Sequence, residues 1–101
     1  MLPINNLRRD SMHPTKQLLI ERNGLRCMLC GKEYPYIQLN WHHIKPKAVC
    51  KYEGLPVDDS YENGALLCLN CHYFIHTIYY WNPEYEKYSR IIRNNKKPVT
   101  D

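Results

Sequence analysis

The stretch LNWHHIKPK, residues 39–47, ends an apolar run with two adjacent histidines, His42 and His43. β-Branched and aromatic residues over 37–44 predict a strand, in which neighbouring side chains point to opposite faces. Two adjacent imidazoles there predict two different tasks rather than one task done twice. For both rings to serve one site, the strand must end or bulge at this pair, because a regular pleat turns one ring away.

Upstream of this strand, a helix is predicted over 14–23, because proline opens the run and glycine follows it. Its residues Leu18, Leu19 and Ile20 are expected to face the core. Downstream, the run from 45 to 61 contains two prolines, a glycine and a cluster of acidic residues. These residues predict a loop between the strand and the elements that follow.

The last third of the chain is predicted to be largely helical. No glycine or proline interrupts 65–81, and the second half of that run is predicted to form a helix. Asn82 and Pro83 then predict the N-cap and first residue of a final helix. Its expected features are a core stripe and an i, i+4 surface pair. The stripe consists of Tyr85, Tyr88, Ile91 and Ile92, and the surface pair is Glu86 with Arg90.

The composition predicts one domain spanning all 101 residues, with loose tails at 1–12 and 95–101. Hydrophobic residues make up 44% and charged residues 24%, as in soluble globular proteins. No apolar run approaches the roughly 20 residues of a membrane helix. The N-terminus has no apolar signal-peptide core, so a cytoplasmic location without membrane attachment is expected. A net charge of +4 suits a polyanionic partner, and also many other soluble proteins.

Four of the five cysteines form two C-x-x-C pairs, Cys27 with Cys30 and Cys68 with Cys71. In a reducing cytosol such pairs are expected to bind metal, and an odd count excludes complete disulfide pairing within the chain. Four thiolates at this spacing suit tetrahedral Zn²⁺, so a structural zinc site is predicted. The alternative is four buried free thiols. Cys50 is left over in the predicted loop, and no role is expected for it.

The two C-x-x-C pairs are much farther apart than the roughly 15–20 residues of a simple zinc ribbon. The segment between them contains LNWHHIKPK. Closure of the zinc site is therefore expected to hold the His-His strand against the later helix, as a scaffold for a second site.

A second pair of histidines, His72 and His76, follows the second C-x-x-C directly. Their i, i+4 spacing places both imidazoles on one face of a helix, where both can reach one cation. Such pairs also occur on ordinary helix surfaces. Asn63 lies between the two histidine pairs in an Asn-Gly dipeptide, which is equally typical of an ordinary turn.

Taken together, these motifs resemble those of HNH endonucleases of the ββα-metal superfamily, in the variety braced by a C-x-x-C pair on each side of the catalytic hairpin. The resemblance spans about 26–78. The residues that carry it are Cys27, Cys30, WHHIKP at 41–46, Asn63, LLCLNCH at 66–72 and His76. It implies an α+β fold with a small ββα-metal core stapled by a four-cysteine zinc site. The N- and C-terminal helices that flank this core are expected from the sequence alone.

The resemblance also implies a role for each residue of the second site. His43, the histidine before Ile44, matches the general base. His42 matches a metal ligand that is Asp in many members and His in others. Asn63 matches the central asparagine, which fixes the loop holding the base in some members and touches the metal in others. His72 matches the third residue of the motif, and His76 the additional ligand of His-rich members.

These residue types can support hydrolysis of a phosphodiester. A neutral imidazole, with a pKa of about 6.5, can accept the proton of the attacking water at physiological pH. A divalent ion can neutralise a non-bridging oxygen and stabilise the leaving alkoxide. The expected function is therefore metal-dependent DNA endonuclease activity, which by resemblance leaves 3′-hydroxyl and 5′-phosphate ends. Its expected residues are His43 as base, His42, His72 and His76 as ligands, and Asn63 as either a further ligand or a clamp.

The identity of the catalytic ion stays open between two classes. Three imidazoles favour Zn²⁺, Ni²⁺, Co²⁺ or Mn²⁺. Mg²⁺ prefers oxygen ligands, and it fits better if only His42 and Asn63 bind alongside waters.

Substrate contacts are expected next to the base. Lys45 and Lys47 follow it and are expected to contact phosphates, although a solvated surface charge is an equally good interpretation of each. Four aromatic residues are candidates for base stacking, but the core is the commoner location for such side chains. These four are Tyr73, Tyr79, Tyr80 and Trp81.

Two other functions remain as alternatives to DNA cleavage by the chain alone. The first is a non-catalytic, zinc-stabilised nucleic-acid-binding or adaptor module with the HNH fold. The second is a nuclease that acts on RNA or within a larger assembly, such as phage packaging or restriction components. A chain of this size leaves no room for a separate target-recognition domain, so specificity is expected from the flanking helices, a homodimer or a partner.

Overall fold

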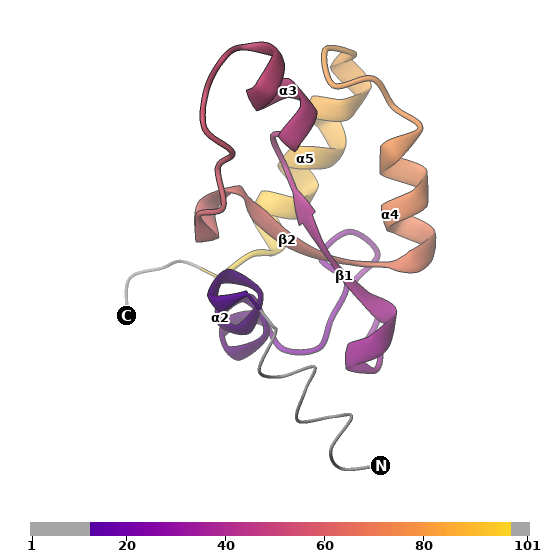
Figure 1. The fold of residues 1–101 in the computed structure, drawn as a ribbon. Coiled ribbons are helices and arrows are strands. Elements are labelled where there is room, and N and C mark those ends of the chain that lie inside the picture. The colour runs from indigo at the N-terminus through magenta and orange to yellow at the C-terminus, as the bar shows by residue number, and fades with distance from the viewer. Residues whose placement is uncertain (1–12, 98–101) are drawn as a thin grey trace.

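The computed structural model describes residues 13–97, in which two strands lie among four helices (Figure 1). The predicted arm at 1–12 lies outside the described residues. The strands are β1 (Leu39–His43) and β2 (Gly64–Cys68), and together with α4 (Leu69–His76) they form a ββα core. The other elements are α2 (Pro14–Asn23), η1 (Tyr36–Gln38), α3 (Lys47–Tyr52), η2 (Tyr61–Asn63) and α5 (Pro83–Asn95). The fold is therefore the predicted small α+β type with flanking helices.

The two strands form an antiparallel pair in regular register. Leu39 pairs with Cys68, and His43 pairs with Gly64 at the other end. The predicted strand over 37–44 is shortened, because Tyr36–Gln38 forms a 3₁₀ turn before it. The strand ends at the histidine pair without a bulge, which is one of the two arrangements that the sequence required.

Helix boundaries follow the capping residues. Gly24 ends α2 at φ +79°, a left-handed conformation that favours glycine, and its N–H donates to the Ile20 carbonyl at 2.8 Å. At the start of α5, the Asn82 side chain accepts a hydrogen bond from the Glu84 N–H at 2.9 Å. Both boundaries are those that the sequence predicts.

One apolar core joins α2, the two strands, α4 and α5. Its fully buried side chains include Leu19 of α2, Leu39 of β1, Leu66 and Leu67 of β2, Ile75 of α4 and Ile92 of α5. Leu18 and Ile20 are partly buried against it. Each large apolar side chain that is removed from water contributes about 1.5–3 kcal/mol to burial free energy, so this core fixes the hairpin relative to the helices.

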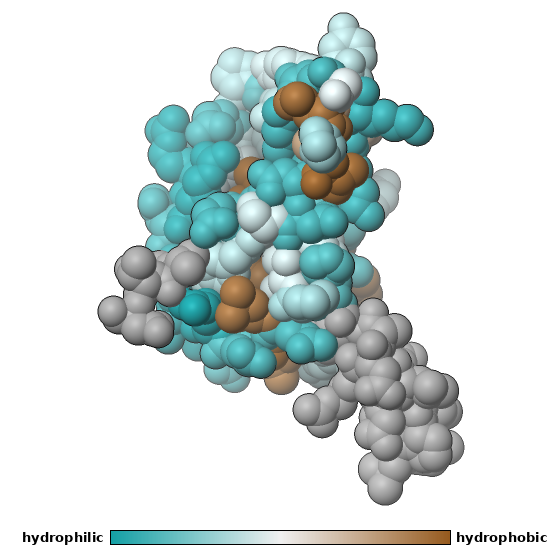
Figure 2. All heavy atoms as spheres, turned by 60° about the vertical axis from the view of Figure 1, so that its left-hand side comes forward, coloured by the Kyte–Doolittle hydropathy of each residue, from teal (hydrophilic) through white to brown (hydrophobic). Residues whose placement is uncertain are grey.

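The predicted loop over 45–61 contains a short helix, α3. Pro46 is its N-cap, and two of its own residues, Val49 and Cys50, are buried. The sequence predicted a loop here because prolines and Gly54 flank the helix, although no helix-breaking residue lies inside it. Cys50 therefore lies on a helix and not in a loop. The face of the molecule drawn in Figure 2 is mostly hydrophilic, with hydrophobic side chains in small separate groups.

The helix predicted in the second half of 65–81 begins and ends earlier than expected, because α4 spans Leu69–His76. The hydroxyl of Thr77 donates to the Phe74 carbonyl at 2.6 Å. This carbonyl of the last turn is therefore bonded to a side chain just past the end of the helix. Residues 77–81 then cross to α5 as a connecting segment.

The buried stripe of α5 is narrower than predicted. Tyr85 and Ile92 are buried, but Ile91 is 37% exposed, and Ser89 takes its place at 1% exposure. The buried residues Tyr85, Ser89 and Ile92 are spaced i, i+4, i+7, which places them on one side of the helix. Glu86 and Arg90 are both exposed, as predicted. The Glu86 carboxylate forms its ion pair with Arg93 at 3.1 Å, two turns away.

The C-terminal end of α5 is tied to the rest of the fold. Asn95 donates to the Met28 carbonyl at 2.8 Å. The Lys96 ammonium donates to the carbonyls of Tyr61, Glu62 and Gly64 at 2.7, 2.8 and 2.9 Å, and so holds η2 in place. The described part of the expected C-terminal tail, 95–97, is thus hydrogen-bonded. Among the described residues, no helix is long and apolar enough to cross a membrane.

Candidate metal-binding and hydrolytic site

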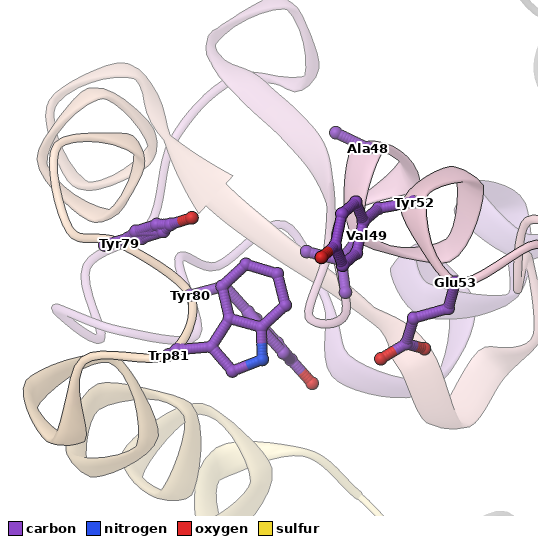
Figure 3. Close-up of a pocket in the computed structure, with 7 residues that line it drawn as sticks. All are labelled: Ala48, Val49, Tyr52, Glu53, Tyr79, Tyr80 and Trp81. Atoms are coloured by element: carbon purple, nitrogen blue, oxygen red, sulfur yellow. The ribbon is translucent and has the colours of Figure 1, made fainter.

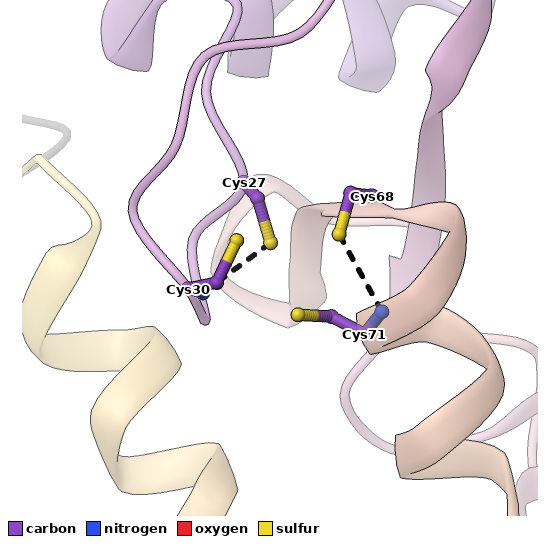
Figure 4. A group of neighbouring side chains, drawn as sticks. All are labelled: Cys27, Cys30, Cys68 and Cys71. Carbon is purple, nitrogen blue, oxygen red and sulfur yellow. Dashed lines mark hydrogen bonds between the residues drawn. The ribbon is translucent and has the colours of Figure 1, made fainter.

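Four cysteines converge where the loop after α2 meets the junction of β2 and α4 (Figure 4). Their sulfur atoms all lie within 4.8 Å of one another. Tetrahedral Zn–S bonds of about 2.3 Å place sulfurs about 3.8 Å apart, so a zinc ion fits this group. Backbone N–H groups of Leu29 and Cys30 donate to Cys27 Sγ, and the Cys71 N–H donates to Cys68 Sγ. The four cysteines fit the predicted structural metal site.

The protonation of these thiols also fits a bound cation. Burial opposes ionisation of Cys30, but the Lys32 backbone N–H and the Tyr34 hydroxyl outweigh it and lower the pKa of Cys30 to about 7. Burial and the neighbouring thiols raise the pKa of Cys71. Without a cation, one ionised thiol in this group therefore opposes ionisation of its neighbours, and a bound cation would remove that opposition.

Three histidines form a second group between β1 and α4. One ring nitrogen from each of His42, His72 and His76 lies within 4.8 Å of the others. The Nε2 atoms of His72 and His76 are 2.9 Å apart, and the His42 ring centroid lies 5.7 Å from each of theirs. His42 is buried, His72 is half-buried and His76 is exposed, so the group opens to solvent on one side. The arrangement suits a metal that keeps an open coordination position.

The electrostatics of this group favour a neutral ligand. Burial, followed by the neighbouring rings of His72, His76 and His43, lowers the pKa of His42 to about 3. Burial and His76 also lower the pKa of His72. Imidazole binds metal in its neutral form, so His42 is ready to act as a ligand at physiological pH.

Tyr85 of α5 holds the His42 ring in place. Its hydroxyl donates to the Ile44 carbonyl at 2.6 Å and lies 3.2 Å from His42 Nε2. All three groups are buried. Sequence reasoning assigned Tyr85 only to a core stripe, because nothing in the local pattern of α5 indicates a contact with a strand 43 residues earlier.

His43 contacts a different set of groups from His42. Its Nε2 lies 2.7 Å from Asp59 Oδ1, and its ring lies 4.6 Å from the Trp41 ring. An ionised carboxylate only accepts hydrogen bonds, so Nε2 carries the hydrogen and Nδ1 keeps the lone pair of the neutral ring. Asp59 was missed from the sequence, where it was only one of several acidic loop residues. His43 is therefore oriented by a carboxylate, with one nitrogen left to accept a proton.

The family model of the HNH endonucleases matches residues 27–77, just over half of the chain. This chain belongs to the HNH endonuclease family. No curated protein and no solved structure matches it. The match includes all the cysteines and histidines of the two groups, whereas α2 and α5 lie outside it.

Asn63 lies at the centre of the HNH motif according to the resemblance. Its side chain forms hydrogen bonds with two segments of backbone, one just after His43 and one just before Asp59. Its Oδ1 accepts from the Lys45 N–H at 2.8 Å. Its Nδ2 donates to the carbonyls of Lys45 and Asp58, at 3.2 and 2.8 Å. The segment after His43 is thereby joined to the segment that carries Asp59. All three of these contacts are to backbone groups.

The basic and aromatic candidates of this HNH chain lie in different settings. Lys45 Nζ pairs with Glu53 Oε1 at 2.6 Å, and Lys47 is exposed at the start of α3. The expectation of a core location is wrong for Tyr73, Tyr79 and Trp81, which are exposed. Tyr80 is half-buried and packs against the core.

Proposed function

We propose that this HNH protein is a metal-dependent endonuclease that hydrolyses DNA phosphodiester bonds. The observation that supports this most strongly is the oriented His43 at the end of the strand whose previous residue, His42, belongs to a group of three metal-competent histidines. A general base and a metal-binding group thus meet at the end of β1. We also propose that residues 1–101 act as one domain.

His43 is proposed to accept the proton of the attacking water at Nδ1. Asp59 keeps the hydrogen of the neutral ring on Nε2 at 2.7 Å and stabilises the imidazolium that forms. Trp41 packs against the ring, and Asn63 holds the backbone that follows it. The ring therefore has little freedom to turn away from the water.

His42, His72 and His76 are proposed to hold the catalytic divalent ion. When bound, this ion supplies the positive charge that stabilises the anionic transition state and the leaving oxygen. Three neutral imidazoles favour Zn²⁺, Ni²⁺, Co²⁺ or Mn²⁺ over Mg²⁺. The exposed side of the group, at His76, leaves a path for a phosphate. The four cysteines are proposed to hold a separate structural zinc.

Lys47 is proposed to contact a substrate phosphate, since it is exposed close to the base in sequence. Lys45 is proposed to do so only after release from Glu53, because the two side chains form an ion pair at 2.6 Å. The resemblance extends the proposal to 3′-hydroxyl and 5′-phosphate products.

The alternative is a non-catalytic nucleic-acid-binding module with the same fold. Such a scaffold needs the four cysteines and the core. It has no need of a buried histidine whose Nε2 is bound to a carboxylate, since an ion pair whose carboxylate is exposed, as Asp59 is, contributes little net stability. The His43–Asp59 contact therefore favours catalysis.

Nicking of supercoiled plasmid tests the proposal. The zinc-loaded protein is incubated with Mg²⁺, Mn²⁺, Ni²⁺ or Zn²⁺ added singly, beside His43→Ala and the control His13→Asn. His13 is the other histidine near Asp59, 3.9 Å from it, and asparagine keeps its N-cap function on α2. We expect metal-dependent nicking by the parent and by His13→Asn, and none by His43→Ala. No nicking by a folded parent, or equal nicking by His43→Ala, would overturn the proposal.

A further inference from the structure

An open aromatic groove of about 820 Å³ lies between α3 and the segment that connects α4 to α5 (Figure 3). One wall consists of residues from α3 and its C-terminal end, and the other of three consecutive aromatic residues. The lining residues are Ala48, Val49, Tyr52, Glu53, Tyr79, Tyr80 and Trp81. Its volume falls within the roughly 300–1,000 Å³ of typical ligand pockets.

The aromatic rings of the groove are exposed to an unusual degree. Tyr52 is 81%, Tyr79 62% and Trp81 53% exposed. Trp81 meets Tyr52 and Tyr80 edge-to-face, with ring centroids 6.0 and 5.4 Å apart. Tyr79 and Trp81 are tilted by 46° to each other, with ring centroids 5.2 Å apart. None of these pairs is stacked face to face, and both rings keep exposed surface for a ligand. A cluster of exposed apolar groups of this kind marks an interaction site.

Both walls of the groove begin next to the candidate hydrolytic site. The chain enters α3 at Lys47, four residues after His43, and reaches Tyr79 three residues after His76. Inside the fold, the Tyr80 ring lies 5.3 Å from the Tyr85 ring, whose hydroxyl contacts His42. A polymer whose phosphate lies at the histidines therefore passes into this groove within a short distance.

The charges beside the groove suit an anionic polymer. Lys47 and Lys51 are exposed on α3, and neither forms an ion pair with another described residue. Glu53, which lines the groove, is neutralised by Lys45 at 2.6 Å. Exposed lysines beside aromatic rings are the combination that binds single-stranded nucleic acid, where the backbone contacts the cations and the bases stack on the rings.

We propose that this groove binds the unpaired bases of a DNA single strand that continues from the phosphodiester at the histidine site. The identification of DNA rests on the proposed function. In a duplex each base already stacks on its neighbours, so only unpaired bases offer a free face to Tyr79 and Trp81. The substrate class that follows is DNA with a single-stranded segment next to the cleaved bond.

Binding measurements test this groove separately from cleavage. The zinc-loaded full chain is titrated, with no other divalent ion, against fluorescein-labelled oligothymidylate and against a labelled hairpin duplex, and fluorescence anisotropy is recorded. A gel checks that the DNA stays intact. The variants are Trp81→Leu, which keeps an apolar side chain without a ring, and Trp81→Phe, which keeps a ring. Ile37→Ala is a control at an exposed apolar residue of η1, outside the groove.

We expect Trp81→Leu to weaken single-strand binding by roughly tenfold, the usual scale for one lost base–aromatic contact, with little change for the duplex. Trp81→Phe and Ile37→Ala should bind the single strand within about twofold of the parent, because a ring face is kept or the groove untouched. Equal single-strand binding by Trp81→Leu and the parent overturns the proposal. A parent that prefers the duplex overturns it too.

Nicking assays with the same variants keep the two proposals apart, on supercoiled plasmid and on a hairpin duplex that carries a single-stranded tail. Ring-dependent single-strand binding without any nicking supports the groove while the nuclease proposal fails. If the parent nicks DNA but its single-strand binding does not depend on Trp81, the nuclease proposal stands and the proposal for the groove is overturned. In that case a protein partner becomes the better explanation for the exposed rings.

Discussion

The cysteine group and the histidine group of this HNH protein are both built around the β1–β2 hairpin, but they differ in number of donors and in closure. The cysteine group has two buried members and an exposed one, Cys30, and its four sulfurs can fill all four positions of a tetrahedral ion. The three histidine nitrogens leave one side exposed at His76. A closed four-donor group is typical of a structural metal and an open three-donor group of a catalytic one. This difference is the basis for our proposal that the cysteines stabilise the fold and the histidines take part in the chemistry.

Removal of a cysteine ligand should have the largest effect. Binding of zinc to such a site contributes apparent free energies of about 10–16 kcal/mol, comparable to the whole stability of a domain. We expect Cys27→Ser to be largely unfolded and depleted in zinc, as measured by circular dichroism and metal analysis. Cys50→Ala is the control, since Cys50 is equally buried but lies outside the group. A folded, zinc-loaded Cys27→Ser protein would show that the cysteines do not brace the fold.

Removal of a histidine ligand should leave the fold intact and abolish activity. His72 is only half-buried, so His72→Ala should keep its structural zinc and melt within a few degrees of the parent. Loss of a metal that supplies several kcal/mol to the transition state should reduce plasmid nicking at least about a hundredfold. Metal titration should find one divalent site per chain instead of two. If His72→Ala unfolds as Cys27→Ser does, the distinction between the two groups is wrong.

Replacement of Asp59, the carboxylate that contacts His43, should have an intermediate effect on activity and little effect on stability. Asp59→Asn keeps the size of the side chain but removes the charge that stabilises the imidazolium. We expect nicking to slow by about 10- to 100-fold, part of the 10²–10⁴ that a general base supplies. Both metal sites should stay filled. Asp58→Asn, at the neighbouring exposed carboxylate, should cut normally, and equal losses in the two variants would argue against a specific role for Asp59.

The two metal-binding groups were predictable from the sequence, but their supporting residues were not. C-x-x-C pairs and the i, i+4 spacing of His72 and His76 are local, so the backbone alone brings those side chains together. Asp59 reaches His43 across 16 residues that include α3 and a segment without regular structure, and Tyr85 reaches His42 across 43. Such contacts depend on the path of a loop and on the packing of α5, which no local pattern specifies.

Tyr85→Phe tests that non-local support and should have the smallest effect on activity. It keeps the ring in the core but removes the hydroxyl that donates to the Ile44 carbonyl and contacts His42. An unsatisfied buried carbonyl should lower the free energy of unfolding by about 1–3 kcal/mol. Divalent binding at the histidines should weaken roughly tenfold, as when a metal ligand loses its outer partner, with a matching loss of nicking below saturating metal. Tyr88→Phe, on the same helix, is the control. Unchanged metal affinity in Tyr85→Phe would mean that β1 and α4 alone hold the histidine group.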